Sequence, residues 1–195
     1  MPTPLPPLTV FDVETTGLAP DRGHRIIEIA GVRIENGAID ETKSFVSLVN
    51  PEREIPWEAK QVNKIKDEDV KNAPGIEEIL PRFLTFAEGS ILVAHNAQFD
   101  MGFLMHEKNF CWGYTELPDC LCTMRLSQTL FPREFGHNLD AVSKRLHLQI
   151  PTARHRALPD VLLTAHALLK MIEIGGIESL DDLKELAGIV MKSRA

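Results

Sequence analysis

The sequence predicts an α/β protein in which a five-stranded mixed sheet is flanked by helices. Strand patterns fill the first quarter of the chain, whereas helical patterns and short apolar strands alternate in the second half. The 195 residues suit one domain, and 44% apolar residues are enough for a substantial core. We therefore expect a short disordered leader over residues 1–7 and a single domain over residues 8–195.

Three strands come first and are expected to form an antiparallel meander. The first is the β-rich run Leu8–Glu14, and the second is Arg25–Glu35. The dipeptide Asn36-Gly37 after the second strand strongly favours a hairpin turn. The returning strand is expected over Lys43–Val49, and Asn50-Pro51 ends it.

Helices and short strands alternate in the second half. Apolar residues at three- and four-residue spacing predict helices, which we place at 76–87, 99–108, 124–130, 139–146 and 158–172. Ile91–Ala94 and Asp119–Thr123 are the expected fourth and fifth strands. Gly175-Gly176 should stop the helix before it, and Ser179-x-x-Asp182 should cap a last helix that runs to about Val190.

Composition limits the class of protein. No apolar run reaches the roughly 18 residues that a membrane span needs, and the N-terminus lacks the basic and apolar parts of a signal peptide. The three cysteines are too few for a disulfide framework, so we expect a cytoplasmic protein without membrane contact. Cys120-x-Cys122 could be half of a metal site, but core packing is favoured because no second pair has zinc-like spacing.

The net charge of −7 is unusual for a protein that binds nucleic acid, because phosphate binding normally requires a basic surface. Two interpretations remain open. Either the protein does not touch nucleic acid, or metal ions supply the positive charge and few phosphates are held. The second interpretation implies weak, salt-sensitive binding unless a partner tethers the protein.

Asp12 and Glu14 are the first candidate site residues. Because side chains two apart on a strand share a face, their carboxylates should stand side by side, where a divalent cation such as Mg²⁺ or Mn²⁺ would offset their repulsion. The alternative is an edge strand with solvated acids. The turn Thr15-Thr16-Gly17 follows at once; its glycine permits close approach of a ligand and its hydroxyls could bind a phosphate or sugar.

The second candidate segment runs from Ala94 to Asp100, where an apolar strand leads into a polar turn. Asp100 falls in the first turn of the next helix, so it could either complement the helix dipole or join a site beyond the strand end. Asn96 is a candidate substrate-binding residue, with a turn or cap role as the alternative.

The third segment contains His155 and Asp160. Asp160 lies early in the strongest helix, and Pro159 before it is tolerated because a first-turn residue needs no N–H. His155 precedes the helix on a loop. It could be a plain surface histidine, or a general base beside a metal-bound water, since its ordinary pKa is near neutral.

Together these segments resemble the DnaQ-like, or DEDDh, exonuclease family, which includes the proofreading epsilon subunit of bacterial replicative DNA polymerase. The motifs are Phe11–Gly17, His95–Asp100 and His155-x4-Asp160, and the similarity extends over residues 8–172. The resemblance implies a ribonuclease H-like fold and a metal-dependent 3′→5′ exonuclease that releases nucleoside 5′-monophosphates. It implies single-stranded 3′ ends of DNA as substrate, with proofreading or repair as the role, and a polymerase or other replication or repair protein as a tether.

The resemblance also assigns roles to residues. It implies that four carboxylates hold two Mg²⁺ or Mn²⁺ ions and that His155 is the general base; the carboxylates are those of Asp12, Glu14, Asp100 and Asp160. The turn of residues 15–17 would then seat the terminal nucleotide. Three alternatives remain: a 3′→5′ exoribonuclease acting on RNA ends or short oligoribonucleotides, an inactive binding module, and a structural protein with solvated acids.

Overall fold

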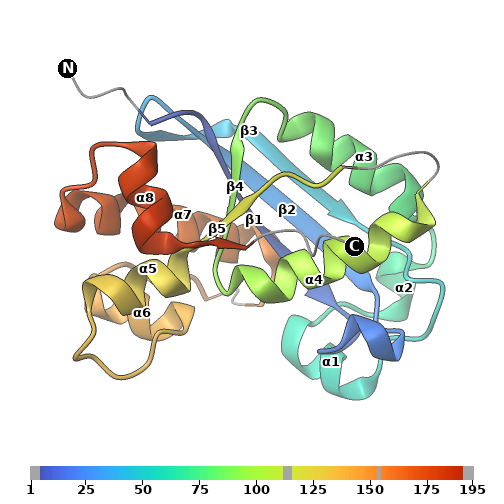
Figure 1. Ribbon diagram of the computed structural model, residues 1–195. Helices are drawn as coiled ribbons and strands as arrows, with labels where there is room; N and C mark the ends of the chain where they lie inside the picture. The colour runs from blue at the N-terminus through green and yellow to red at the C-terminus, as the bar shows by residue number, and fades with distance from the viewer. Residues whose placement is uncertain (1–4, 112–115, 153–154, 191–195) are drawn as a thin grey trace.

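The computed structural model describes residues 5–111, 116–152 and 155–190, and a mixed sheet forms its centre (Figure 1). Within these residues the sheet has six strands in the order β3-β2-β1-β4-β5-β6. The strands are β1 (Leu8–Thr15), β2 (Ile26–Glu35), β3 (Ala38–Leu48), β4 (Ile91–Ala94), β5 (Cys120–Cys122) and β6 (Ile189–Val190). β1 pairs antiparallel with β2 and parallel with β4, so the predicted combination of a meander and parallel strands is confirmed.

Helices cover both faces of the sheet. The α-helices are α1 (Trp57–Asn63), α2 (Asp67–Val70), α3 (Ile76–Phe86), α4 (Ala97–Glu107), α5 (Thr123–Leu130), α6 (Leu139–Arg145), α7 (Ala157–Gly175) and α8 (Leu180–Ala187). Helices α3 and α4 pack on one face, and α7 packs on the other with α5, α6 and α8 around it (Figure 1). The short 3₁₀ helices are Pro20–Arg22 and Lys108–Phe110.

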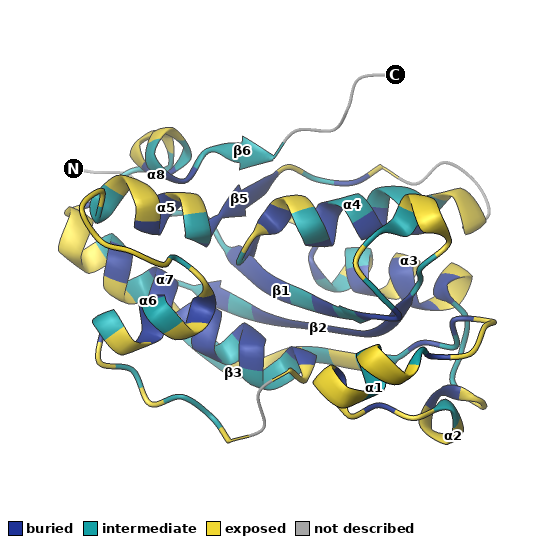
Figure 2. Cartoon of the chain, turned by 90° about the horizontal axis from the view of Figure 1, so that it is seen from below, coloured by how far each residue is buried: buried dark blue, intermediate teal, exposed yellow. Residues whose placement is uncertain are grey.

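The alternation of side chains along β1 decides where the acids point. Leu8 and Val10 belong to the core under α7, whereas Phe11 and Val13 belong to the core with α3 and α4. Residues 12 and 14 continue the row that faces α7, as a period of two requires. Figure 2 shows how deeply this strand and its neighbour β2 are buried. Cys120 and Cys122 are likewise buried on β5 in the core with α3 and α4, which confirms their packing role.

The hairpin between β2 and β3 forms where the sequence predicts it. Asn36 has φ 53° and Gly37 has φ 76°, so both turn residues adopt the left-handed conformation that a tight hairpin needs. The returning strand begins at Ala38, five residues earlier than expected, because the turn leads directly into the ladder. The register then shifts between Val32 and Arg33, where extra residues of β3 bulge out.

The C-terminal prediction is partly wrong. Ser179 caps α8 as expected, with its hydroxyl accepting a 3.1 Å hydrogen bond from the backbone N–H of Asp182. The helix ends at Ala187, however, because Gly188 turns the chain with φ 66°. Ile189–Val190 then pairs antiparallel with β5 and adds the sixth strand.

Residues 1–4 of the expected leader lie outside the described residues. Leu5 packs against the core under α7, and the Pro7 carbonyl accepts a 3.1 Å hydrogen bond from the backbone N–H of Ile91, so the end of this segment is held against the fold. Helices α1 and α2 were not anticipated from the sequence. None of the helices in the described ranges is long and apolar enough to cross a membrane.

Candidate active site

Three carboxylates from two distant parts of the chain converge at the C-terminal half of β1. Asp12 and Glu14 extend from β1 toward α7, and Asp160 extends from the first turn of α7. One side-chain oxygen from each lies within 4.8 Å of the others. All three ligand atoms are carboxylate oxygens, the kind that Mg²⁺ and Mn²⁺ prefer. The donor set therefore fits a hard divalent cation.

Asp100 reaches the same strand from α4. β1 and β4 pair only over Leu8–Val10, and β4 ends at Ala94, so the edge of β1 beyond Val10 is not paired with β4. Asp100 lies at this edge, and its Oδ1 accepts a 3.2 Å hydrogen bond from the backbone N–H of Val13. Asp100 thus contacts the residue between Asp12 and Glu14, although it lies outside the group of three whose oxygens are within 4.8 Å.

Burial governs the ionisation of Asp100. Its side chain is 2% exposed. Removal from water raises the pKa of this carboxyl from 3.8 to about 7, against the opposing effect of the hydrogen bonds from the backbone N–H groups of Val13 and of Asp100 itself. Without a cation the charged form is therefore disfavoured, and a positive ion beside Asp100 would restore it.

The start of α7 positions Asp160 and His155. The backbone N–H of His155 donates a 3.3 Å hydrogen bond to Asp160 Oδ2, and His155 itself has φ 62°. Pro159 lies in the first turn without disturbing it, since the backbone N–H of Asp160 still donates to the Arg156 carbonyl at 3.3 Å. His155 is exposed on the loop before α7, at the side of the helix start that carries Asp160.

The turn after β1 is held by hydrogen bonds of its own threonine hydroxyls. Thr15 donates its hydroxyl to the Gly17 carbonyl at 2.7 Å. Thr16 is 1% exposed, and its hydroxyl accepts from the backbone N–H of Arg25 and contacts His24 Nδ1 at 3.2 Å. The hydroxyl of Thr16 is therefore engaged in holding the turn in shape.

A cavity of about 470 Å³ opens directly beside this turn and Glu14. Its walls combine backbone and hydroxyl groups with apolar side chains from β1, α1 and α4. The lining residues are Val13, Glu14, Thr15, Thr16, Gly17, Leu18, His24, Pro56, Glu58, Ala59, Val62, Asn63 and Phe99. Cavities of this size and mixed lining are typical small-ligand sites.

Asn96 lies apart from that cavity. It precedes α4 in the left-handed conformation, with φ 62° and ψ 47°, and its side chain makes no capping hydrogen bond to the helix. It lines a separate cavity of about 500 Å³ between α4, α5 and β6. The neighbouring His95 is structural, because its ring nitrogens contact the Thr123 hydroxyl and the His137 carbonyl, each at 2.9 Å.

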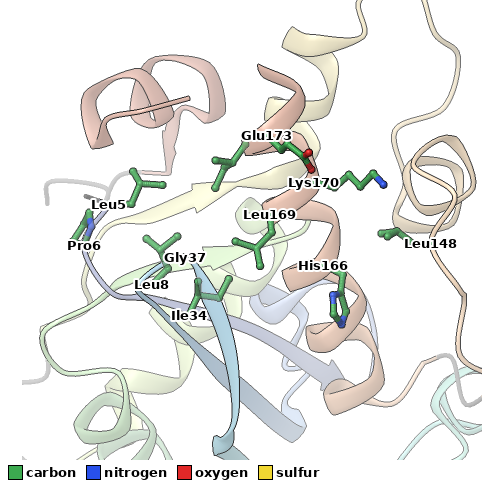
Figure 3. A pocket seen from close by; sticks show the side chains of 11 residues that line it. Leu5, Pro6, Leu8, Ile34, Gly37, Leu148, His166, Leu169, Lys170 and Glu173 are labelled. Carbon is green, nitrogen blue, oxygen red and sulfur yellow. The ribbon is translucent and has the colours of Figure 1, made fainter. Parts of the chain in front are cut away.

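A further cavity of about 450 Å³ lies at the opposite end of β1 (Figure 3). Leu5, Pro6 and Leu8 line one side of it, and His166 and Leu169 of α7 line the other. Because β1 runs from Leu8 to Thr15, this cavity is separated from the acids by most of the strand. It contains none of the predicted site residues.

Sequence reasoning missed several residues that the fold brings to the site. Leu18 and Val62 are exposed apolar side chains at the cavity, and His24 lies against Gly17. The exposed position of Leu18, 84%, follows from the turn and left no periodic signal in the sequence. Phe99 packs on Phe103 with ring centroids 5.1 Å apart, and it also borders the cavity.

Comparisons with known proteins all point to exonucleases. A family model described as exonuclease matches residues 9–168. The DNA polymerase III subunit epsilon-like protein of Rhodobacter capsulatus is 46% identical over 173 residues, which is 87% of this chain and 24% of that protein. The chain therefore spans about a quarter of the length of this curated relative.

Two solved structures share the fold. Exonuclease X in complex with 5′-overhanging duplex DNA has a TM-score of 0.74 and 29% identity, covering 93% of this chain and 99% of that one. The nuclease domain of 3′hExo, a DEDDh family member bound to rAMP, has a TM-score of 0.76 and 16% identity, and the match covers 87% of this chain and 92% of that one. The second likeness is one of fold, and it agrees with the expected ribonuclease H-like architecture.

Proposed function

The chain belongs to the exonuclease family of the DnaQ-like type, and from this premise we propose that it removes nucleotides from single-stranded 3′ ends of DNA, releasing nucleoside 5′-monophosphates. The observation that carries the proposal is the convergence of the acids. Asp12, Glu14 and Asp160 lie within 4.8 Å of one another through their oxygens, and Asp100 is hydrogen-bonded to the backbone between the first two.

The carboxylates of Asp12, Glu14, Asp100 and Asp160 would hold two divalent cations, Mg²⁺ or Mn²⁺. When bound, such ions activate the attacking water and offset charge on the scissile phosphate and the leaving 3′ oxygen. The chain's own contribution is to hold the acids in place before the ions arrive. Strand β1, helix α4 and helix α7 each fix one part of this set.

His155 would accept the proton of the attacking water. Its backbone is tied to Asp160, so its side chain extends from the same helix start as one of the proposed ligands. An exposed imidazole can accept a proton and return it to solvent.

The cavity beside Glu14 would seat the terminal nucleotide. The turn of Thr15, Thr16 and Gly17 forms one wall, and Leu18 and Phe99 offer apolar surfaces to a base. The 3′ end would then meet the acids at Glu14, which belongs to both the cavity and the acidic cluster. Asn96, at the start of α4, would contact the strand outside this cavity.

A tether would explain how an acidic protein acts on DNA. With 28 acidic and 21 basic residues the chain carries a net charge of −7 and repels a long run of phosphates, so its own affinity for DNA should be low and sensitive to salt. The name of the Rhodobacter relative supports a polymerase or another replication or repair protein as the tether, and proofreading or repair as the role.

A cleavage time course tests the proposal. Single-stranded DNA, duplex DNA and RNA of the same sequence, labelled at the 5′ end, are incubated with and without Mg²⁺ or Mn²⁺. We expect a ladder of 5′-labelled strands that shortens from the 3′ end of single-stranded DNA only when the metal is present, with nucleoside 5′-monophosphates found when the unlabelled products are separated by chromatography. Faster shortening of RNA would establish the exoribonuclease alternative in its place. Cleavage at internal positions, or cleavage in the presence of a chelator, would contradict the proposed reaction.

A further inference from the structure

A buried carboxylate that the proposed reaction does not use lies beside the acidic cluster. Glu28 is on β2, and the strand register places it directly opposite Glu14 on β1. Its side chain is 2% exposed. Two acids that face each other across neighbouring strands repel, and a buried carboxylate is costly without a partner. This position therefore requires a compensating group.

Arg156 supplies that group from a point 128 residues further along the chain. Its Nε donates to Glu28 Oε2 at 3.0 Å and its Nη2 donates to Glu28 Oε1 at 2.6 Å, so the guanidinium forms a bidentate ion pair with the carboxylate. The backbone N–H of Ala157 adds a 2.9 Å hydrogen bond to Oε2. The contact with Glu28 raises the pKa of Arg156, and the charge of Glu14 adds to the effect.

These contacts hold the start of α7 against β2 at Glu28, which lies opposite Glu14 of the proposed site. Arg156 is the residue just before the helix, with His155 on one side of it and the helical turn of Asp160 on the other. The left-handed backbone of His155 would be free to relax if the helix start moved. Since a shift of about 1 Å at a catalytic group can cost about a hundredfold in rate, fastening this segment has a direct consequence for turnover.

We propose that Glu28 and Arg156 are positioning residues that hold Asp160 and His155 against Asp12 and Glu14. Their pairing also neutralises Glu28, so that the cations need to offset the four proposed ligands and not a fifth carboxylate opposite Glu14. The proposal rests on the proposed function for its effect on turnover. Its structural half, the fastening of the helix start, can be measured without any substrate or metal.

Four variants separate the fastening of the helix start from the neutralisation of Glu28. Arg156→Gln removes the ion pair and leaves Glu28 charged beside Glu14, whereas Arg156→Lys keeps the positive charge but loses the bidentate contact. Glu28→Gln removes the charge while its amide oxygen can still accept from the Ala157 N–H. The double variant Glu28→Gln/Arg156→Gln has neither charge, so the uncompensated carboxylate is gone.

The chain offers a matched control in a second buried ion pair. Glu107 at the end of α4 accepts hydrogen bonds from Arg25 Nε at 2.9 and 3.0 Å and from the backbone N–H of Ile26 at 2.9 Å. The contacts are of the same kind, but they fasten the C-terminal end of α4 and do not touch α7. Glu107→Gln should therefore cost stability without changing the geometry at the start of α7.

The first measurement is amide hydrogen exchange in the metal-free protein. We expect faster exchange at Ala157 and across residues 155–160 in Arg156→Gln and in the double variant, and no change there in Glu107→Gln. Unchanged exchange over this segment in both Arg156→Gln and the double variant would overturn the proposal. This measurement stands even if the wild-type protein cleaves neither DNA nor RNA, an outcome that would remove the proposed function alone.

The second measurement is kcat and KM on single-stranded DNA at saturating Mg²⁺. We expect Arg156→Gln to lower kcat by about 10- to 100-fold, the usual effect of removing a group that orients metal ligands, with a much smaller change in KM. Arg156→Lys should recover part of the loss, and the double variant should be more active than Arg156→Gln. An equal fall in kcat for Glu107→Gln would show that lost stability alone explains the effect and would refute the positioning role.

Discussion

The Asp100 carboxylate accepts a 3.2 Å hydrogen bond from the backbone N–H of Val13, the residue that separates Asp12 from Glu14. This contact joins two of the three sequence motifs in one hydrogen bond. It forms because β4 ends at Ala94, one residue after its last pairing with β1, and leaves the strand edge beyond Val10 to Asp100. The first turn of α4 thus carries Asp100 to the backbone between the two acids of β1.

Asp12→Asn and Asp100→Asn should each lower the exonuclease rate by about 10³-fold or more, because a lost metal ligand removes several kcal/mol of transition-state stabilisation. Both substitutions keep the shape of the side chain, so the circular dichroism spectra should remain close to that of the wild type. Asp21→Asn is the matched control, since Asp21 is an exposed acid in the 3₁₀ helix that follows the turn. Wild-type turnover in either test variant would remove these residues from the proposed site.

Asp100 should make a contribution to the stability of the metal-free protein that falls as pH rises from about 4 to about 7. Burial raises the pKa of Asp100 from 3.8 to about 7, so the folded state keeps a proton that the unfolded chain has already released. Because the folded state binds more protons in this range, its stability falls with pH, by on the order of a few kcal/mol in total. Below pH 3.8 both states are protonated and the effect vanishes.

Chemical denaturation of metal-free wild type and Asp100→Asn across this range checks the prediction. Asn keeps the acceptor for Val13 but cannot ionise, so its curve should be flatter and should lie above that of the wild type at pH 7 and higher. Parallel curves for the two proteins would show that Asp100 does not titrate as its burial implies.

His155→Ala should lower kcat at pH 7 by about 10²- to 10⁴-fold, the usual contribution of a general base. The loss should shrink as pH rises, because hydroxide can replace the base, so log kcat of the variant should climb where the wild type has levelled off. His166→Ala, on the exposed side of α7, should behave as wild type. A variant rate that equals the wild-type rate at every pH would exclude His155 as the base.

Gly17→Ala should raise KM by about tenfold or more while leaving the acids intact, because an added Cβ would overlap the imidazole of His24, so that either this ring or the turn must shift and the wall of the cavity changes. The cavity that would seat the nucleotide shares this turn. Adding His24→Ala to Gly17→Ala removes the obstacle and should restore much of the loss in KM. If Gly17→Ala binds and cleaves DNA normally, the turn does not form a wall of the substrate site.

Local patterns in the sequence predicted the frame of the site. Strict alternation places Asp12 and Glu14 on one face of β1, and the apolar stripe of α7 places Asp160 in its first turn. The Asn36-Gly37 turn and the cap at Ser179 were also predictable, because each depends on residues within a few positions. These features were confirmed because local chemistry alone decides them.

Features that depend on distant contacts were not predictable from the sequence. After Gly188 ends the last helix, Ile189–Val190 continue as a strand because β5 offers a pairing edge. Helix α1 has little apolar pattern of its own, and it is fastened by Asn63, whose side chain donates to the Thr15 carbonyl at 3.3 Å. A signal for Glu28 did exist, since a charged residue interrupts the apolar run from Ile26 to Val32, but its partner 128 residues away could not be inferred from the sequence.

The central claim is that acids from three separate segments share divalent cations. A crystal grown with Mn²⁺ and measured at the manganese absorption edge tests it most directly. The account predicts anomalous peaks within about 2.5 Å of carboxylate oxygens from Asp12, Glu14 and Asp160, with Asp100 completing the set. Peaks elsewhere on the surface and none among these four side chains would contradict it.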